Sequence, residues 1–395
     1  MHIHVIGSGV IGLTTAYYLC KKGHTVTILE KESEVANGAS FANGGQLSYC
    51  FSDPMGKPNL FTKFPKIVLN KDLGIKINTP SSVNSWTWLI SFLSNCSSKK
   101  YLNNQLQLAE LSLASKPLLQ DIQNNLNLDF DYEKTRKMSF FENENDFTYE
   151  KKSVDIKRNI GNDNQVLSIK EAELIEPGIT NLSNKYAGVI FSESDEVGDT
   201  YAFCRSLKEW LVNHGANFLF KTNVNSLKKN KTKLIGIETD KGFIESNKLI
   251  VCAGSLTDKI IETKPLIIPV RGYSLTLPKG SVSFDVSLTL SDQRILFTKL
   301  GKKVRITGFA DFFSKTQDDK KRIDELLRSA KNVAPNLADY DSSSIEAWSG
   351  DRPLTPSSIP FIGPSKTQGV YINSGHGFYG WTLSFSSGKK IANYF

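Results

Sequence analysis

The chain has 395 residues, of which 39% are hydrophobic and 22% charged, and its formal net charge is +8. This length suits two connected domains, and this composition is that of a globular protein rather than a disordered one. The Lys and Arg residues are spread along the chain instead of forming one stripe, which argues against a nucleic-acid partner.

The first predicted elements form a βαβ unit with a glycine-rich turn. Residues 2–6 and 25–29 read as short buried strands, and a helical pattern lies between them. Gly7 permits a tight turn, Gly9 lets the backbone approach a pyrophosphate, and Gly12 lets the helix pack closely on the strand. The N-terminus of that helix offers unpaired N–H groups to phosphates.

An acidic residue, Glu30, closes the second predicted strand 18 positions after Gly12. A carboxylate there can accept hydrogen bonds from ribose hydroxyls and repels a 2′-phosphate. The complete unit predicts a binding site for an adenine dinucleotide.

Two further segments are candidates for the same site. Residues 36–48 are rich in Gly, Ser and Asn, which is typical of a plain surface loop or of a loop whose backbone N–H groups contact a ligand. Residues 248–260 read as a strand that ends at Ala253 and Gly254, followed by a helix start. In a doubly wound sheet such a strand end lies at the ligand crevice.

The middle of the chain contains two helical patterns and a basic cluster. Residues 82–100 are apolar on a helical period and end in two lysines, which suits an interfacial helix or core packing equally well. Residues 102–124 are helical without a following parallel strand, and the basic cluster at 228–233 predicts a solvated hairpin turn. No apolar run reaches the roughly 18 residues of a membrane-spanning helix.

A second glycine motif, with Gly375, His376, Gly377 and Gly380, follows a predicted strand at 370–373 and opens a helix. Only fifteen residues follow Gly380, too few for another nucleotide-binding unit. The motif can instead direct a helix N-terminus at negative charge, such as the N1 and O2 region of a reduced flavin. One dinucleotide site and one helix end for a ring favour FAD over NAD.

Other site chemistries lack their motifs. The sequence has no GxSxG, HExxH or Walker pattern, and no metal site is expected because the remaining histidines have no metal-binding neighbours. Five cysteines without a CxxC pair indicate reduced thiols in a cytosolic setting, and no signal peptide is expected. Without a haem or iron–sulfur motif, the predicted electron acceptor is oxygen or a quinone.

The chain resembles the D-amino acid oxidase superfamily of FAD-dependent amine oxidoreductases, and within it the small subunit type of bacterial D-amino acid dehydrogenase. The stretches that carry the resemblance run from the first residues to nearly the last: "VIGSGVIGLTTAYYL", "VTILEK", "SFANGGQLS", "WTWLISFLSNC", "IPVRGYSLTL", "WSGDRPLTPSSIPFIGP" and "NSGHGFYGWTLSFSSG".

The resemblance implies an α/β fold of the D-amino acid oxidase (GR2) type, a discontinuous Rossmann-like FAD-binding domain with an inserted α+β substrate domain built on an antiparallel sheet. We expect residues 1–50, 165–262 and 345–395 to form the FAD-binding domain and residues 51–164 and 263–344 the substrate domain. The boundaries are therefore predicted near Cys50, Gln165, Glu262 and Ile345.

The resemblance and the residue patterns together give the candidate site residues. Arg352 is predicted to clamp a substrate carboxylate, the alternative being a salt bridge to Asp351. Tyr273 either donates its hydroxyl to that carboxylate or packs in the core, and Arg271 is a structural candidate. His376 is expected to serve backbone geometry near the ring rather than acid–base chemistry. The predicted FAD-binding residues are Gly7, Gly9, Val10, Ile11, Gly12, Glu30, Lys31, Ser40, Asn43, Gly44, Gly45, Gln46, Leu47, Val224, Ala253, Gly254, Arg352, Gly375, His376, Gly377, Gly380, Trp381 and Thr382.

The resemblance implies oxidative deamination of D-amino acids to 2-oxo acids and ammonia, by hydride transfer from Cα to N5 of non-covalently bound FAD. Electrons would pass to a quinone or another acceptor, in the cytoplasm or at the inner face of the cell membrane, with no nucleic-acid partner. The alternatives are an oxidase or dehydrogenase of glycine, sarcosine, proline or hydroxyproline, and a flavin subunit of a larger complex. The oligomeric state is left open.

Overall fold

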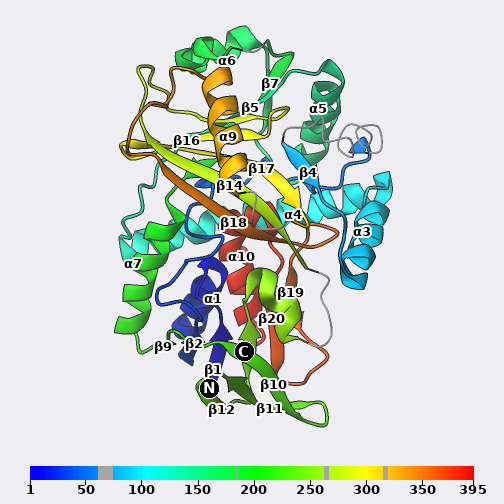
Figure 1. Ribbon diagram of the computed structural model, residues 1–395, viewed down its shortest axis with the longest axis vertical. Helices are drawn as coiled ribbons and strands as arrows, with labels where there is room; N and C mark the ends of the chain where they lie inside the picture. The colour runs from blue at the N-terminus through cyan, green and yellow to red at the C-terminus, as the bar shows by residue number, and fades with distance from the viewer. Residues whose placement is uncertain (61–73, 184, 262–266, 315–318) are drawn as a thin grey trace.

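The computed structural model describes residues 1–60, 74–183, 185–261, 267–314 and 319–395. Two large sheets dominate these residues, a six-stranded one in the lower half of Figure 1 and a nine-stranded one in the upper half. The mixed α/β fold agrees with the fold class expected from the sequence.

The six-stranded sheet is parallel except at one edge. Its order is β19-β20-β13-β1-β2-β9, and only β19 pairs antiparallel, with β20. Its central strands are short and apolar because both faces are covered by other elements. The strands are β1 (His2–Ile6), β2 (Thr25–Leu29), β9 (Asn217–Leu219), β13 (Leu249–Val251), β19 (Phe361–Pro364) and β20 (Val370–Ser374).

Register aligns the carboxyl ends of three of these strands. Ile6 at the end of β1 pairs with Leu29 of β2 on one side and with Val251 of β13 on the other. The segments that follow these strands therefore leave the sheet at the same edge, as expected for a doubly wound sheet.

The two helices that follow the glycine motifs pack against each other beside this sheet. These are α1 (Val10–Lys21) and α10 (Gly380–Ala392), the blue and red helices in Figure 1, and α7 (Thr200–Asn213) also contacts α1. The helix α1 lies between the two predicted strands as expected, and α10 begins at Gly380, where the second glycine motif predicts a helix.

Two smaller sheets accompany the six-stranded one. The predicted hairpin is confirmed, because β10 (Val224–Asn230) and β11 (Lys233–Thr239) pair antiparallel and β12 (Gly242–Glu245) adds a third strand. A two-stranded sheet joins β3 (Gln46–Leu47) to β8 (Glu196–Val197).

The nine-stranded sheet is largely antiparallel. Its order is β18-β14-β17-β16-β15-β5-β7-β6, and β4 pairs with β17. The strands are β4 (Ile75–Ile77), β5 (Lys137–Phe141), β6 (Gln165–Leu167), β7 (Gly188–Ser192), β14 (Ile268–Pro278), β15 (Ser287–Leu290), β16 (Ile295–Leu300), β17 (Lys303–Phe312) and β18 (Glu346–Leu354).

Helices cover this sheet and extend to its side. The helix α9 (Asp319–Val333) packs on β14 and β17, where its apolar stripe closes a second core. Within the described ranges, the remaining helices are α3 (Val83–Asn95), α4 (Ser98–Leu126), α5 (Glu144–Arg158), α6 (Ile169–Ile175) and α8 (Thr257–Ile260), with 3₁₀ turns at Pro177–Asn181, Gly254–Leu256 and Gly377–Tyr379.

The segment 82–100, expected to follow one helical period, is divided. The helix α3 ends at Asn95, and α4 begins at Ser98 and contains all of the predicted helix 102–124. Among the described residues, no helix is long and apolar enough to cross a membrane.

Sheet membership differs from the predicted domain ranges at two places. Residues 165–167 and 188–192 form β6 and β7, and residues 346–354 form β18, all in the nine-stranded sheet rather than beside β1. A strand pattern in a sequence does not say which sheet the strand joins, because pairing depends on distant partners. The boundary expected near Glu262 lies outside the described residues, and the division into domains stays a prediction.

Candidate functional site

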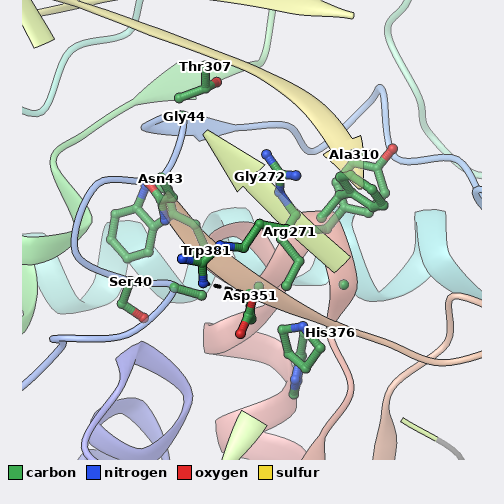
Figure 2. Close-up of a pocket in the computed structure, with 18 of the residues that line it drawn as sticks. Ser40, Asn43, Gly44, Arg271, Gly272, Thr307, Ala310, Asp351, His376 and Trp381 are labelled. Carbon is green, nitrogen blue, oxygen red and sulfur yellow. Dashed lines mark hydrogen bonds and ion pairs between the residues drawn. The ribbon is translucent and has the colours of Figure 1, made fainter. Parts of the chain in front are cut away.

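A cavity of about 1670 Å³ is lined by residues of both large sheets. The six-stranded sheet contributes residues after its strand ends, and the nine-stranded sheet contributes residues of β14, β17 and β18. Figure 2 shows labelled side chains from these elements around one space. Of the predicted site residues, all line the cavity except Gly12, Leu47, Gly375 and Thr382.

The first glycine turn is shaped as its spacing predicts. Gly7 has a φ of +97°, and a Cβ on it would lie 2.7 Å from the carbonyl oxygen of Cys252. A Cβ on Gly12 would lie 1.9 Å from the carbonyl oxygen of Gly7, so only glycine lets α1 start here. A Cβ on Gly9 would meet nothing nearer than the Ser40 hydroxyl at 3.4 Å, because this position faces the cavity.

The N-terminus of α1 presents uncapped N–H groups to the cavity. Gly9 provides no side-chain cap, and the first turn carries no acidic residue. The N–H of Val10 donates to the hydroxyl of Ser40 at 3.2 Å. A phosphate at this point would meet the positive end of the helix dipole.

Glu30 lines the cavity at the end of β2, where it is held by Ser8. The backbone N–H and the hydroxyl of Ser8 donate to Glu30 Oε2 at 2.8 and 2.7 Å, and the N–H of Glu32 donates to Oε1 at 3.0 Å. These bonds fix the carboxylate at the edge of the cavity. The role of Ser8 was not predicted, because the glycine spacing gives no signal for the residue between Gly7 and Gly9.

The loop after β2 joins both parts of the structure. Asn43 Oδ1 accepts from the N–H of Gly45 at 2.9 Å, and its carbonyl accepts from Arg305 of β17 at 3.2 Å. A Cβ on Gly44 would lie 3.1 Å from the hydroxyl of Thr307, which Figure 2 shows beside it. The alternative of a plain surface loop is therefore wrong, since the loop lines the cavity.

The second glycine motif brings another helix end to the same cavity. The helix α10 has no side-chain cap and no acidic residue in its first turn. Thr382 in that turn accepts from the N–H of Ser48 at 2.9 Å, which ties α10 to the loop. Trp381 is buried, and its indole N–H has no partner among the described residues.

Arg352 extends from β18 into the cavity without a carboxylate partner. Its Nη1 donates to the carbonyl oxygen of Phe309 at 2.8 Å, and its guanidinium lies 4.9 Å from the ring centre of Phe378. Burial lowers the pKa of Arg352 to about 10, so the group remains a cation at neutral pH. Within the described ranges, no ion pair involves Arg352, which leaves donors of its planar fork for an anion.

The alternative salt bridge between Asp351 and Arg352 does not form. Asp351 instead accepts from Arg271 Nη1 at 3.1 Å, the dashed line in Figure 2. Arg271 also pairs with Asp319 and donates to Ser349 at 2.8 Å. These hydrogen bonds raise the pKa of Arg271, and the group holds β14, β18 and α9 together.

Tyr273 lies in the core beneath α9. Its side chain is 2% exposed, and its hydroxyl donates a hydrogen bond to Asp311 Oδ2 at 3.0 Å. Arg322 of α9 donates hydrogen bonds to both carboxylate oxygens of Asp311. Burial raises the pKa of Tyr273. Because a phenol has one proton, this arrangement leaves none for a substrate carboxylate and favours the packing alternative.

His376 is a buried neutral imidazole that lines the cavity. It is 2% exposed, and neither ring nitrogen has a partner among the described residues. Burial lowers the pKa of His376 to about 3, so the ring carries no charge at neutral pH. Its backbone bridges Leu354 and precedes the turn into α10, which accords with a role in backbone geometry.

Two features of the site were not predicted. A Cβ on Gly272 would lie 2.0 Å from Arg352 Nη1, so this glycine of β14 makes room for the guanidinium. The carbonyl oxygen of Phe309 accepts the hydrogen bond from Arg352. Phe309 has a φ of +63°, a strained conformation for a phenylalanine. Gly272 follows Arg271 in a strand-like segment, and its lack of a side chain was the only signal available.

A set of buried and half-buried charged groups, most of which line the cavity, was also missed. Lys157 pairs with Asp53 at 3.1 Å, Lys57 pairs with Glu150, and Lys137 donates to the hydroxyl of Ser48 at 2.8 Å. Burial lowers the pKa of Lys137 to about 8. These residues belong to three separate segments, 48–57, β5 and α5, so no local motif identifies them.

Comparison with known families gives one match along nearly the whole chain. The profile of the family described as "FAD dependent oxidoreductase" (DAO) matches residues 2–394. A D-amino acid dehydrogenase of Vibrio cholerae serotype O1 (strain M66-2) is 30% identical over 403 residues, covering 100% of this chain and 94% of the relative.

Solved structures share the fold at low identity. The glycine oxidase of Bacillus cereus ATCC 14579 has a TM-score of 0.72 at 19% identity, covering 100% of this chain and 94% of that one. The L-proline dehydrogenase of P. horikoshii has a TM-score of 0.72 at 17% identity, covering 99% and 92%.

Proposed function

The chain belongs to the DAO family of FAD-dependent oxidoreductases, and from this premise we propose that it is a dehydrogenase of D-amino acids. The product would be an imino acid, which water converts to a 2-oxo acid and ammonia. A quinone or another acceptor would then take the electrons.

FAD is the cofactor of the family, and three features of this chain support non-covalent binding along the cavity. The uncapped N-terminus of α1 suits the pyrophosphate, and Glu30 suits a ribose. The uncapped N-terminus of α10 and the unpartnered indole N–H of Trp381 suit the electron-rich edge of the ring. When bound, FAD supplies a two-electron acceptor for the hydrogen at the substrate Cα.

The proposed substrate class rests on the position of Arg352 in the cavity. A desolvated guanidinium without a carboxylate partner, facing the cavity, is matched by the carboxylate of an amino acid. Two parallel hydrogen bonds would fix the direction of the Cα–H bond, so that positioning rather than a protein base drives the reaction. His376, neutral and without a partner, does not repel the substrate ammonium group.

The substitution Arg352→Ala tests the clamp. We expect KM for D-amino acids to rise at least ~100-fold, because charge-assisted hydrogen bonds are lost. FAD absorbance after gel filtration should be unchanged, and Arg352→Lys should recover only part of the loss. Unchanged kinetics in Arg352→Ala would remove this assignment.

Substrate class and acceptor are tested on the wild-type protein. D-alanine added without oxygen should bleach the flavin absorption, whereas L-alanine should not. Bleaching by glycine, sarcosine or D-proline alone would assign the enzyme to those substrates. Turnover with a quinone or dye but not with oxygen would support a dehydrogenase, and a yellow, inert protein would indicate a subunit of a complex.

A further inference from the structure

The helix α3 exposes a row of large apolar side chains. Val83, Trp86 and Ile90 are 81%, 50% and 68% exposed. They are spaced three and four positions apart, so they lie on one face of the helix. Figure 1 places α3 at the right-hand edge of the molecule, away from the six-stranded sheet.

The opposite face of α3 already supplies the core contacts of this helix. Trp88 and Phe92 are buried and stack with ring centres 5.0 Å apart. The indole N–H of Trp88 donates to the carbonyl oxygen of Leu354 at 3.0 Å. Core packing therefore accounts for one face of the helix, while the apolar outer face stays exposed in the part of the chain that the structure describes.

The chain segment that contains α3 carries charge of one sign. Residues 74–109 contain Lys76, Lys99 and Lys100 and no Asp or Glu. Lys99 and Lys100 are exposed and follow the end of α3, which itself carries no charged residue. An apolar helix face with an exposed Trp and adjacent lysines has the chemistry of a segment that lies in the headgroup region of an anionic bilayer.

We propose that the outer face of α3, formed by Val83, Trp86 and Ile90 with Lys99 and Lys100 beside it, docks the protein on an anionic lipid membrane. The apolar side chains enter the acyl boundary and the lysines contact the lipid phosphates. This inference is independent of the substrate.

The docking face lies close to the cavity. Leu354, whose carbonyl oxygen accepts the hydrogen bond from the Trp88 indole, follows Arg352 by two residues in the chain. Met55 and Leu60 pack in the same apolar cluster as Trp88 and also line the cavity. Docking through α3 therefore brings the cavity near the bilayer, where apolar electron acceptors dissolve.

Vesicle co-sedimentation of the full FAD-loaded chain tests the proposal. We expect binding to vesicles of phosphatidylcholine and phosphatidylglycerol (3:1), weaker binding to phosphatidylcholine alone, and at least tenfold weaker binding in 0.5 M NaCl. The double variant Trp86→Ser with Ile90→Ser should lose at least tenfold in binding to the anionic vesicles. Lys99→Ser with Lys100→Ser should weaken binding and flatten its salt dependence.

A matched control replaces two exposed apolar residues elsewhere. Leu174 and Phe243 are 84% and 52% exposed, and Leu174→Ser with Phe243→Ser should bind vesicles like the wild type. FAD absorbance and the thermal midpoint verify folding of every variant. Equal vesicle binding by the α3 variant and the wild type would overturn the proposal. A wild-type dimer in light scattering that the α3 variant abolishes would also overturn it, because a second copy of the chain would then cover this face.

Discussion

Gly272 has no side chain, and this leaves the space that the guanidinium of Arg352 occupies. The guanidinium occupies the space where a Cβ on Gly272 would stand, 2.1 Å from the guanidinium carbon. The ring centre of Phe378 lies 4.9 Å from that carbon. The guanidinium is the far end of a flexible side chain, so it would move before the sheet does, and the clamp would be displaced while the fold survives.

The substitution Gly272→Ala should therefore act through Arg352. We expect KM for the amino acid to rise at least ~10-fold with a smaller change in kcat, because the carboxylate loses a correctly placed fork. In the Arg352→Ala background, the same substitution should cause no further rise, since the group that it displaces is absent. Steady-state kinetics of the four proteins measure this coupling, and additive losses would contradict it.

The helix pair α1 and α10 fixes two helix ends on one cavity. The hydroxyl of Thr14 in α1 donates to the carbonyl oxygen of Ser384 in α10 at 3.0 Å. A Cβ on Gly388 would lie 3.1 Å from the carbonyl carbon of Thr14, so the two backbones approach closely. Because each helix is held along its length by the other, their N-terminal turns cannot shift independently.

Enlarging the contact should strain both helices. Gly388→Leu places a side chain where backbone already lies, and we expect it to lower the free energy of unfolding by about 1–3 kcal/mol and to weaken FAD retention. Lys389→Leu adds the same side chain at the next, exposed position and should change stability by less than about 0.5 kcal/mol. Urea unfolding with flavin absorbance as a second probe measures both, and equal effects would contradict close helix packing.

Across the whole molecule, buried polar bonds join the loop that leaves the six-stranded sheet to helix α5 beside the nine-stranded sheet. Lys157 of α5 donates to Asp53 Oδ1 at 3.1 Å and to the carbonyl oxygen of Cys50 at 3.2 Å. Burial opposes ionisation of Asp53, but the ammonium groups of Lys157 and Lys57 and the hydrogen bonds from Gln105 and Lys157 together outweigh it and lower the pKa of Asp53. The side chains of Lys157 and Asp53 are 1% and 3% exposed, so each charge is stabilised by its partner rather than by water.

Removal of one partner should be costly. Lys157→Met leaves Asp53 buried without its cation, and we expect the free energy of unfolding at pH 7 to fall by about 3–5 kcal/mol. The loss should shrink as the pH falls towards 4, because without Lys157 the Asp53 carboxyl takes up a proton more readily in the folded state than in the unfolded chain. Lys152→Met, at an exposed site on the same helix, should change stability by less than about 0.5 kcal/mol. Urea unfolding at both pH values measures these effects, and a loss that grows at low pH would contradict this electrostatic origin.

Sequence patterns were sufficient to predict the parts of the site that are local in the chain. The strands at 2–6 and 25–29, the turn at Gly7 and the helix from Gly380 are where their patterns predict. Such features depend on conformational limits and hydrophobic spacing within a few neighbouring residues, which a sequence states directly.

Contacts between residues far apart in the chain became known only from the three-dimensional structure. It paired Asp351 with Arg271 rather than Arg352, engaged the hydroxyl of Tyr273 with Asp311, and placed β18 in the larger sheet. It also decided that α3 leaves one apolar face outside the core. Pairing across a sheet and burial on one side of a helix depend on partners far along the chain, and no local pattern records which partner a residue will find.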